Sequence, residues 1–204
     1  MKEILFIQSS INGANSQTKR MLNYFEHCWI KNQKNTLIIK RDLVKTPLPI
    51  MDEEIFSAYY STPLIQQSEK QKKAIEISNE LIDEIKRSEL IVITAPMYNL
   101  SISSQLKNYF DLIIRAGLTF SYINNERVGL LKNKKALILT SQGGLKYNDN
   151  IDYINNYLRD ILNFVGIEDS TFIGVEGVAM NPDNIELEHD NAETKIIEFI
   201  NKYY

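Results

Sequence analysis

The sequence predicts a doubly wound α/β fold, in which a five-stranded parallel sheet of order 2-1-3-4-5 carries helices on both faces. Apolar runs of strand length recur along the chain, and segments with the spacing of amphipathic helices separate them. Five strands favour this order over the six-stranded dinucleotide-binding fold. With 204 residues, 44% of them apolar, the chain is long enough for one substantial core. Residues 1–204 are therefore expected to form a single domain.

Five segments are the expected strands. The runs at 3–8, 90–96 and 135–141 are nearly continuous in apolar residues, as is typical of strands buried on both faces of a parallel sheet. The run at 35–43 is rich in β-branched residues, and a weaker run follows at 170–177. The order of these segments along the chain defines strands 1 to 5 of the predicted sheet.

Helices are expected between these strands. Apolar residues recur at three- and four-residue spacing from Ala74 to Ile85, from Ile102 to Ile113 and from Ile151 to Val165. We interpret these stripes as core-facing and assign them no chemistry. A further helix is expected to begin near Gln17, with Ser16 as its N-cap.

One connection, residues 45–69, does not fit the alternation. It lies between the second strand and the following helix and contains three of the chain's five prolines, Pro47, Pro49 and Pro63. A connection of this length in a compact domain is usually functional or forms an interface. Its tyrosines, Tyr59 and Tyr60, favour an interface or a lid.

Charge and composition exclude several classes of function. A formal net charge of −3 offers no basic surface for nucleic acid. No apolar run approaches the roughly 20 residues that span a bilayer, and the N-terminus lacks a signal peptide, so neither a membrane nor an exported protein is expected. The single cysteine, Cys28, permits no disulfide within the chain and fits a reducing, cytoplasmic setting.

The two histidines are far apart in the sequence. His27 lies in a predicted helix and His189 in the acidic stretch ELEHD, and we interpret both as surface or helix residues. Neither a metal site nor a Ser-His-Asp triad is expected.

Ligand-suited segments follow the first, third and fourth strands. The carboxyl ends of parallel strands meet at one edge of the sheet, where such folds bind ligands. After the first strand, Ser10, Ser16 and Thr18 offer hydroxyls beside a helix N-terminus, which is a suitable site for a phosphate, and Gly13 permits a tight turn. The alternative for this loop alone is a plain capped turn.

The segment after the third strand has little preference for strand or helix. Pro96 ends the strand, Met97 and Tyr98 offer flat apolar surface, and Asn99 offers both a donor and an acceptor. Ser101 or Ser103 then begins the next helix. After the fourth strand, the pair Gly143 and Gly144 lets backbone amides approach a ligand closely. Three such loops together indicate a binding site more strongly than any one of them.

Four blocks carry a resemblance to a known family: SSINGANSQT, APMYNLSISSQLKNYFD, RAGLTFSY and TSQGG. They resemble the FMN-dependent NADH:quinone and azo-compound oxidoreductases, the bacterial azoreductase family of the flavodoxin-like superfamily, over essentially the whole chain. The resemblance implies a flavodoxin-like fold, bound FMN, NADH or NADPH as electron donor, and reduction of quinones and azo compounds by ping-pong hydride transfer. It also implies a homodimer whose pockets are closed by the partner subunit.

The resemblance assigns the site residues as well. No side chain is expected to be catalytic, because the flavin carries the redox chemistry. Aromatic walls of the substrate pocket are implied at Phe120 and Phe164, although both could be ordinary core aromatics. FMN contacts are implied for Ser10, Ser16, Gln17, Thr18, Pro96, Met97, Tyr98, Asn99, Leu100, Ser141, Gln142, Gly143 and Gly144.

Two positions depart from the family's commonest pattern, and two other functions compete with it. Leu100 stands where members often have Phe, and Gln142 where some have Arg, which leaves substrate range and nicotinamide preference open. A flavodoxin-type one-electron carrier is the alternative function, though the chain is long and its charge modest for that class. A phospho-receiver domain is excluded, because the first strand ends in Gln8, Ser9 and Ser10 instead of clustered aspartates.

Overall fold

The computed structural model describes residues 2–144 and 152–203. Its main sheet has five parallel strands in the order β2-β1-β3-β6-β7. Once the two strands of a separate hairpin are left out of the count, this order is the predicted 2-1-3-4-5. The strands are β1 (Lys2–Gln8), β2 (Thr36–Asp42), β3 (Leu90–Pro96), β6 (Lys135–Ser141) and β7 (Asp169–Val175).

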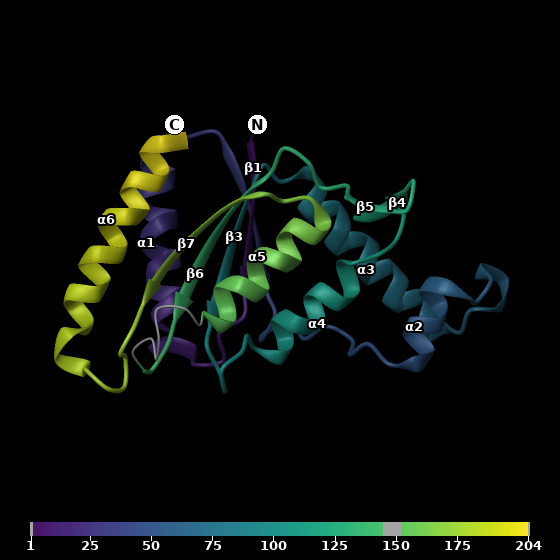
Figure 1. Ribbon diagram of the computed structural model, residues 1–204, viewed down its shortest axis with the longest axis horizontal. Coiled ribbons are helices and arrows are strands. Elements are labelled where there is room, and N and C mark those ends of the chain that lie inside the picture. Colours follow the sequence, from purple (N-terminus) through teal and green to yellow (C-terminus); the bar gives the residue numbers. More distant parts are fainter. Residues whose placement is uncertain (1, 145–151, 204) are drawn as a thin grey trace.

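Helices cover both faces of this sheet (Figure 1). Successive residues of a strand point to opposite faces, so Ile4 and Phe6 pack in one buried cluster and Leu5 and Ile7 in the other. The first cluster includes side chains of α1 and α6, and the second includes side chains of α3, α4 and α5. The helices are α1 (Gln17–Asn32), α3 (Glu69–Arg87), α4 (Ser104–Ile113), α5 (Tyr153–Val165) and α6 (Ile185–Tyr203).

The helix N-termini agree with the expected caps. Ser16 caps α1 by accepting a hydrogen bond from the Lys19 amide. Of the two serines considered for α4, Ser103 is the cap, and its hydroxyl accepts from the Leu106 amide at 3.2 Å. The predicted helix that ends at Val165 forms α5, while its first expected residue, Ile151, lies outside the described residues.

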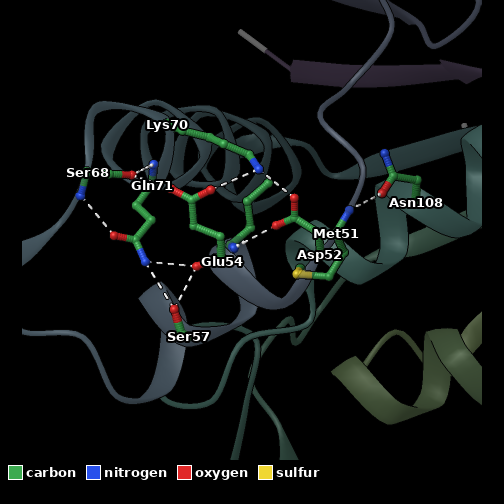
Figure 2. Close-up of polar contacts among 9 residues, drawn as sticks. Met51, Asp52, Glu54, Ser57, Ser68, Lys70, Gln71 and Asn108 are labelled. Atoms are coloured by element: carbon green, nitrogen blue, oxygen red, sulfur yellow. Dashed lines mark hydrogen bonds and ion pairs between the residues drawn. The ribbon is translucent and has the colours of Figure 1, made fainter.

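Residues 45–69, which we call the arm, contain a short helix that the sequence analysis did not assign. This helix, α2 (Glu53–Tyr60), is followed by a 3₁₀ turn over Leu64–Gln66. Figure 2 shows how the arm is held to α3. The Lys70 ammonium lies 2.5 Å from Asp52 Oδ2 and 3.0 Å from Glu54 Oε2.

A second attachment joins the arm to α4. The Asn108 side chain accepts from the Met51 amide at 3.2 Å (Figure 2). It also donates to the Pro49 carbonyl at 2.9 Å. The side-chain oxygen and the side-chain nitrogen of Asn108 therefore both bond to the arm. We conclude that the arm is fixed to the domain by polar contacts at two places and leaves apolar side chains exposed.

A β-hairpin that was also not assigned lies apart from the main sheet. It consists of β4 (Phe120–Ile123) and β5 (Glu126–Gly129), paired antiparallel. Asn124 and Asn125 form its two-residue turn with φ of 52° and 64°, which Asn tolerates better than most residues. Two further 3₁₀ turns span Gly13–Asn15 and Pro182–Asn184.

The expectation that both histidines are surface or helix residues holds for their helical positions, but only one of them lies at the surface. His27 is exposed on α1, as expected, but His189 is fully buried in α6. The charged neighbours of His189 in the sequence indicate a solvated position, whereas the packing of α6 against α1 buries the ring.

Among the described helices, none is long and apolar enough to cross a membrane. The described residues also bring no three metal-ligating side chains together.

Candidate functional site

An open hollow of about 420 Å³ lies at the carboxyl edge of the sheet, where the loops after β1, β3 and β6 meet. This is the edge at which open parallel sheets bind ligands. The segment after β7 completes its wall. The hollow is lined by Ser10, Asn12, Ser16, Gln17, Pro96, Met97, Tyr98, Ser141, Gln142, Gly143 and Val178.

The first wall is the loop that enters α1. Gly13 adopts a φ of +52°, which permits the tight turn expected there. The Ser16 hydroxyl caps the helix and lies 3.2 Å from the buried Thr18 hydroxyl. Two hydroxyls and the free amides of a helix's first turn thus meet at one point, and the helix dipole adds partial positive charge. This arrangement suits a phosphate group.

The loop after β3 is tied to that first wall through Tyr98. The Tyr98 hydroxyl accepts a hydrogen bond from the Ile11 amide at 3.1 Å and lies 3.3 Å from the Ser10 hydroxyl. On the other side, the Met97 amide donates to the Ser141 carbonyl at 2.7 Å. Residues 97 and 98 therefore fix the spacing between all three loops of the hollow.

Asn99 and Leu100 form the tip of a tight turn at the rim. The Tyr98 amide donates to the Ser101 carbonyl at 2.8 Å, and the Ser101 amide donates back at 3.1 Å. Both central residues have positive φ, 49° for Asn99 and 65° for Leu100, and both are exposed. A leucine in this conformation is strained, and such strain is found most often at functional sites.

The loop after β6 forms the opposite wall and is bound to the segment after β7. The Gln142 amide donates to the Val175 carbonyl, and the Val178 amide donates to the Gln142 carbonyl. A Cβ atom added at Gly144 would meet the nearest protein atom at 3.6 Å, an ordinary contact. The surrounding protein thus leaves room for a Cβ atom at this position.

The structure brings most of the predicted residues to this hollow, but not all of them. Thr18 lies buried behind Ser16, Asn99 and Leu100 stand at the rim, and Gly144 follows the lining residue Gly143. Phe120 and Phe164 do not line the hollow.

The two phenylalanines pack on each other instead. Their ring centroids are 4.8 Å apart, and the Arg127 guanidinium lies 4.5 Å from the centroid of the Phe164 ring. Phe164 lies near the C-terminal end of α5, and Phe120 begins the hairpin. Phe164 also packs against the main buried cluster, so within one chain both rings serve the core and not the hollow.

Three residues near the hollow were not predicted to be part of it. Asn12, which lies within the block SSINGANSQT but was given no role, and Val178, which follows β7, both line it. His189 lies behind it, with Nε2 2.7 Å from Gln17 Oε1. Burial lowers the pKa of His189, and the nearby Arg20 guanidinium lowers this pKa further. His189 reaches this site only because α6 packs on α1, so no local motif in the sequence predicts its position there.

Comparison with known proteins gives consistent results. A family model described as flavodoxin-like fold matches residues 2–200. The chain is 39% identical over 198 residues to an FMN-dependent NADH:quinone oxidoreductase of Escherichia coli strain K12, covering 96% of this chain and 97% of that relative. A relative of the same name from Shigella flexneri matches to the same extent.

Solved structures agree in fold. The structure of an azoreductase from Bacillus anthracis strain Sterne superposes with a TM-score of 0.88 at 23% identity, covering 99% of this chain and 100% of that chain. An FMN-dependent NADH-azoreductase from Bacillus anthracis strain Ames Ancestor, solved in complex with FMN, superposes with a TM-score of 0.84 at 25% identity, covering 98% of this chain and 99% of that one.

Proposed function

The chain belongs to the flavodoxin-like fold family, and on this premise we propose that it is an FMN-dependent NADH:quinone oxidoreductase that also reduces azo compounds. The observation that carries the proposal is the hollow at the carboxyl edge. Loops from three strands converge there, and they carry the residues expected to bind FMN. The chain is also 39% identical to enzymes of that name over nearly its whole length. We further propose that residues 1–204 act as one FMN-binding domain in the cytoplasm.

The residues present fit FMN in both chemistry and arrangement. Ser10, Ser16, Gln17 and Thr18 would hold the phosphate and the ribityl chain, because hydroxyls and first-turn amides of α1 meet there. The absence of a side chain at Gly143 and Gly144 would let their amides contact the pyrimidine edge. The segment from Pro96 to Leu100, with Ser141 and Gln142, would surround the ring system. When bound, FMN supplies a ring that takes two electrons from NADH and passes them to a quinone or an azo compound.

The protein's own part in the reaction is to position FMN and to stabilise charge on its ring. Tyr98 fixes the distance between the phosphate loop and the ring-binding loop, since its hydroxyl contacts both Ser10 and the Ile11 amide. The Gly143 and Gly144 amides would stabilise negative charge at the edge they contact. We propose no side-chain acid or base. Donor and acceptor would use one pocket in turn, as in a ping-pong cycle.

A homodimer would complete this pocket. The arm exposes large apolar side chains, among them Ile50 at 78% and Ile65 at 94% exposure, which isolated soluble domains rarely gather in one segment. Phe120 and Phe164 do not reach the hollow of their own chain. The exposed arm supports an isologous dimer, and we propose that Phe164, with the buried Phe120 packed against it, forms a wall of the partner's pocket.

Some features of specificity are set by positions that differ from the family's usual pattern. Leu100 at the rim offers less flat surface than an aromatic residue, and we propose that it widens the range of acceptors. Gln142 carries no charge, so this position gives no cation for the 2′-phosphate of NADPH. We therefore propose NADH as the preferred donor.

Steady-state turnover tests the proposed function. Purified protein is reconstituted with FMN, and NADH oxidation is followed with a small benzoquinone and with an azo dye as acceptors. We expect sustained turnover with both acceptors and none by the apoprotein beyond that of free FMN. FMN binding without sustained NADH oxidation would contradict the proposal and would point to a one-electron carrier.

A further inference from the structure

His189 is a buried polar residue to which the proposed function assigns no role. It belongs to α6, has no exposed surface, and lies 172 positions from its hydrogen-bond partner Gln17 in the sequence. Its Nε2 atom is 2.7 Å from Gln17 Oε1. Its other ring nitrogen, Nδ1, is buried and has no hydrogen-bond partner among the described residues.

These contacts determine the protonation state of the ring. Gln17 Oε1 can only accept, so Nε2 of His189 carries the hydrogen and donates it. A second proton on Nδ1 would be buried without an acceptor, which costs free energy. The charged groups around the ring are Arg20 on α1 and Glu186 and Asp190 on α6, and burial outweighs the two carboxylates, so the pKa of His189 lies below its usual value. The ring is therefore a neutral donor at neutral pH.

The Gln17 side chain is held at both ends. Its Nε2 donates to the Asn15 carbonyl at 3.3 Å while its Oε1 accepts from His189. One turn further along α1, the Arg20 guanidinium makes two hydrogen bonds of 2.7 Å to the Glu186 carboxylate. Two side-chain contacts from α6 therefore fix the first turn of α1, at one of the two ends where a helix frays.

We propose that His189 is a positioning residue for the phosphate of FMN, acting through Gln17. This inference rests on the proposed function, because it needs FMN at the N-terminus of α1. A phosphate is bound well only where the first-turn amides already point at it, since ordering them on binding would cost conformational entropy. By holding Gln17, the first residue of α1, His189 keeps those amides in place before the ligand arrives. Changing His189 should therefore weaken the binding of a flavin that carries the phosphate and leave the binding of one without it unchanged.

The test compares three substitutions of His189 with two ligands. His189→Gln keeps a donor at nearly the position of Nε2, His189→Asn is too short to reach Gln17, and His189→Leu has no donor. Affinities of the apoprotein for FMN and for riboflavin, which lacks the phosphate, are measured by flavin fluorescence titration.

We expect FMN to bind roughly three- to tenfold more weakly to the Asn and Leu variants, which corresponds to the loss of one hydrogen bond. Affinity for riboflavin should be unchanged, and His189→Gln should bind FMN as the wild type does. Equal losses for FMN and riboflavin, or no rescue by His189→Gln, would overturn the inference and leave His189 a structural residue.

A second variant guards against a folding defect at the buried position. Gln17→Leu removes the same hydrogen bond from the partly exposed side, and adding His189→Leu to it should weaken FMN binding no further than Gln17→Leu alone does. Additive losses would contradict coupling between the two residues. Failure of the proposed function is a separate outcome, because it would appear in the wild type as no FMN binding or no NADH oxidation.

Discussion

Tyr98 is the residue on which the geometry of the hollow depends most directly. Its hydroxyl contacts Ser10 and the Ile11 amide, and its own amide closes the turn that carries Asn99 and Leu100 at the rim. The position of Tyr98 after the third strand predicts a flat surface for the ligand, but nothing in the sequence predicts this second role. A hydroxyl contact between residues 88 positions apart leaves no pattern in the sequence.

The variant Tyr98→Phe tests this bridging role. It keeps the ring and removes the hydroxyl that joins the phosphate loop to the ring-binding loop. We expect FMN to bind roughly three- to tenfold more weakly, as for one or two lost hydrogen bonds, while the thermal midpoint changes little because the Ile11 amide can bond to water. Flavin fluorescence titration gives the affinity, and Tyr60→Phe, at an exposed position of the arm, is the control. Unchanged affinity in Tyr98→Phe would show that the bridge does not matter.

His189 predicts a pH dependence of stability. Its pKa is lowered in the folded protein from an ordinary value of 6.5, so above that pH the ring is neutral in both states and adds no pH dependence. As the pH falls below 6.5, the unfolded chain binds a proton that the folded chain does not, and the free energy of unfolding decreases. The decrease continues until the pH reaches the lowered pKa, with a slope of at most about 1.4 kcal/mol per pH unit for one proton.

Urea unfolding of the apoprotein between about pH 5 and 7.5 measures this effect. His189→Gln should lose stability less steeply on acidification than the wild type, because its side chain does not titrate. His27→Gln, on the exposed face of α1, serves as the control for removing a histidine. Parallel pH profiles for wild type and His189→Gln would contradict a buried neutral ring.

At the scale of elements, prediction from sequence succeeded where the pattern was local. The nearly continuous apolar runs predicted three buried strands, and Ser16 predicted the start of α1. The hairpin β4–β5 and helix α2 were not assigned, because each is short and packs its few apolar residues through contacts distant in sequence. The C-terminal helix α6 was not assigned either, although Ala192, Ile196 and Ile200 recur at helical spacing on its buried face.

The attachment of the hairpin gives a prediction at this scale. Gly129, the last residue of β5, lies so close to the C-cap of α5 that an added Cβ would be 2.2 Å from the Gly166 amide nitrogen. Gly166 itself has a φ of +100°, so neither glycine has a ready substitute. Gly129→Ala should lower the free energy of unfolding by about 1–3 kcal/mol or more, because backbone must move to admit the methyl group.

Thermal melts of the apoprotein check this prediction. A loss of that size corresponds to a fall of several degrees in Tm for a chain of this length. Gly143→Ala, whose added Cβ would meet Ala179 at an ordinary 3.4 Å, should melt as the wild type does. Equal Tm values for Gly129→Ala and Gly143→Ala would show that the hairpin does not depend on close glycine contact.

At the scale of the whole molecule, contacts within one chain do not account for the exposed apolar side chains of the arm. Polar contacts at Lys70 and Asn108 hold it in place and Ile55 is buried, yet other large apolar side chains of the arm face outward. The length and the tyrosines of this connection predict an interface or a lid. A fixed arm with exposed Phe56, Leu64 and Ile65 favours the interface, because a lid has to move.

Sedimentation of wild type and one arm variant tests the dimer. We expect the wild type to sediment as a dimer at micromolar concentration and Ile65→Glu to shift it toward monomer, with a parallel loss of NADH oxidation. A charge buried in an apolar interface is costly to desolvate. Ile30→Glu, at an exposed apolar position on α1, is the matched control and should remain dimeric. A wild-type monomer with full turnover would rule out a pocket shared between subunits.

The central claim, that this chain passes electrons from NADH to a second substrate through FMN, is tested most directly by anaerobic rapid mixing in two steps. FMN-loaded protein is first mixed with NADH, and the reduced protein, freed of nucleotide, is then mixed with a small benzoquinone. We predict that the flavin absorbance near 450 nm, a property of the cofactor, bleaches fully with one equivalent of NADH and returns with one equivalent of quinone, each faster than steady-state turnover. Bound flavin that NADH fails to bleach, or that quinone fails to restore, would contradict the account.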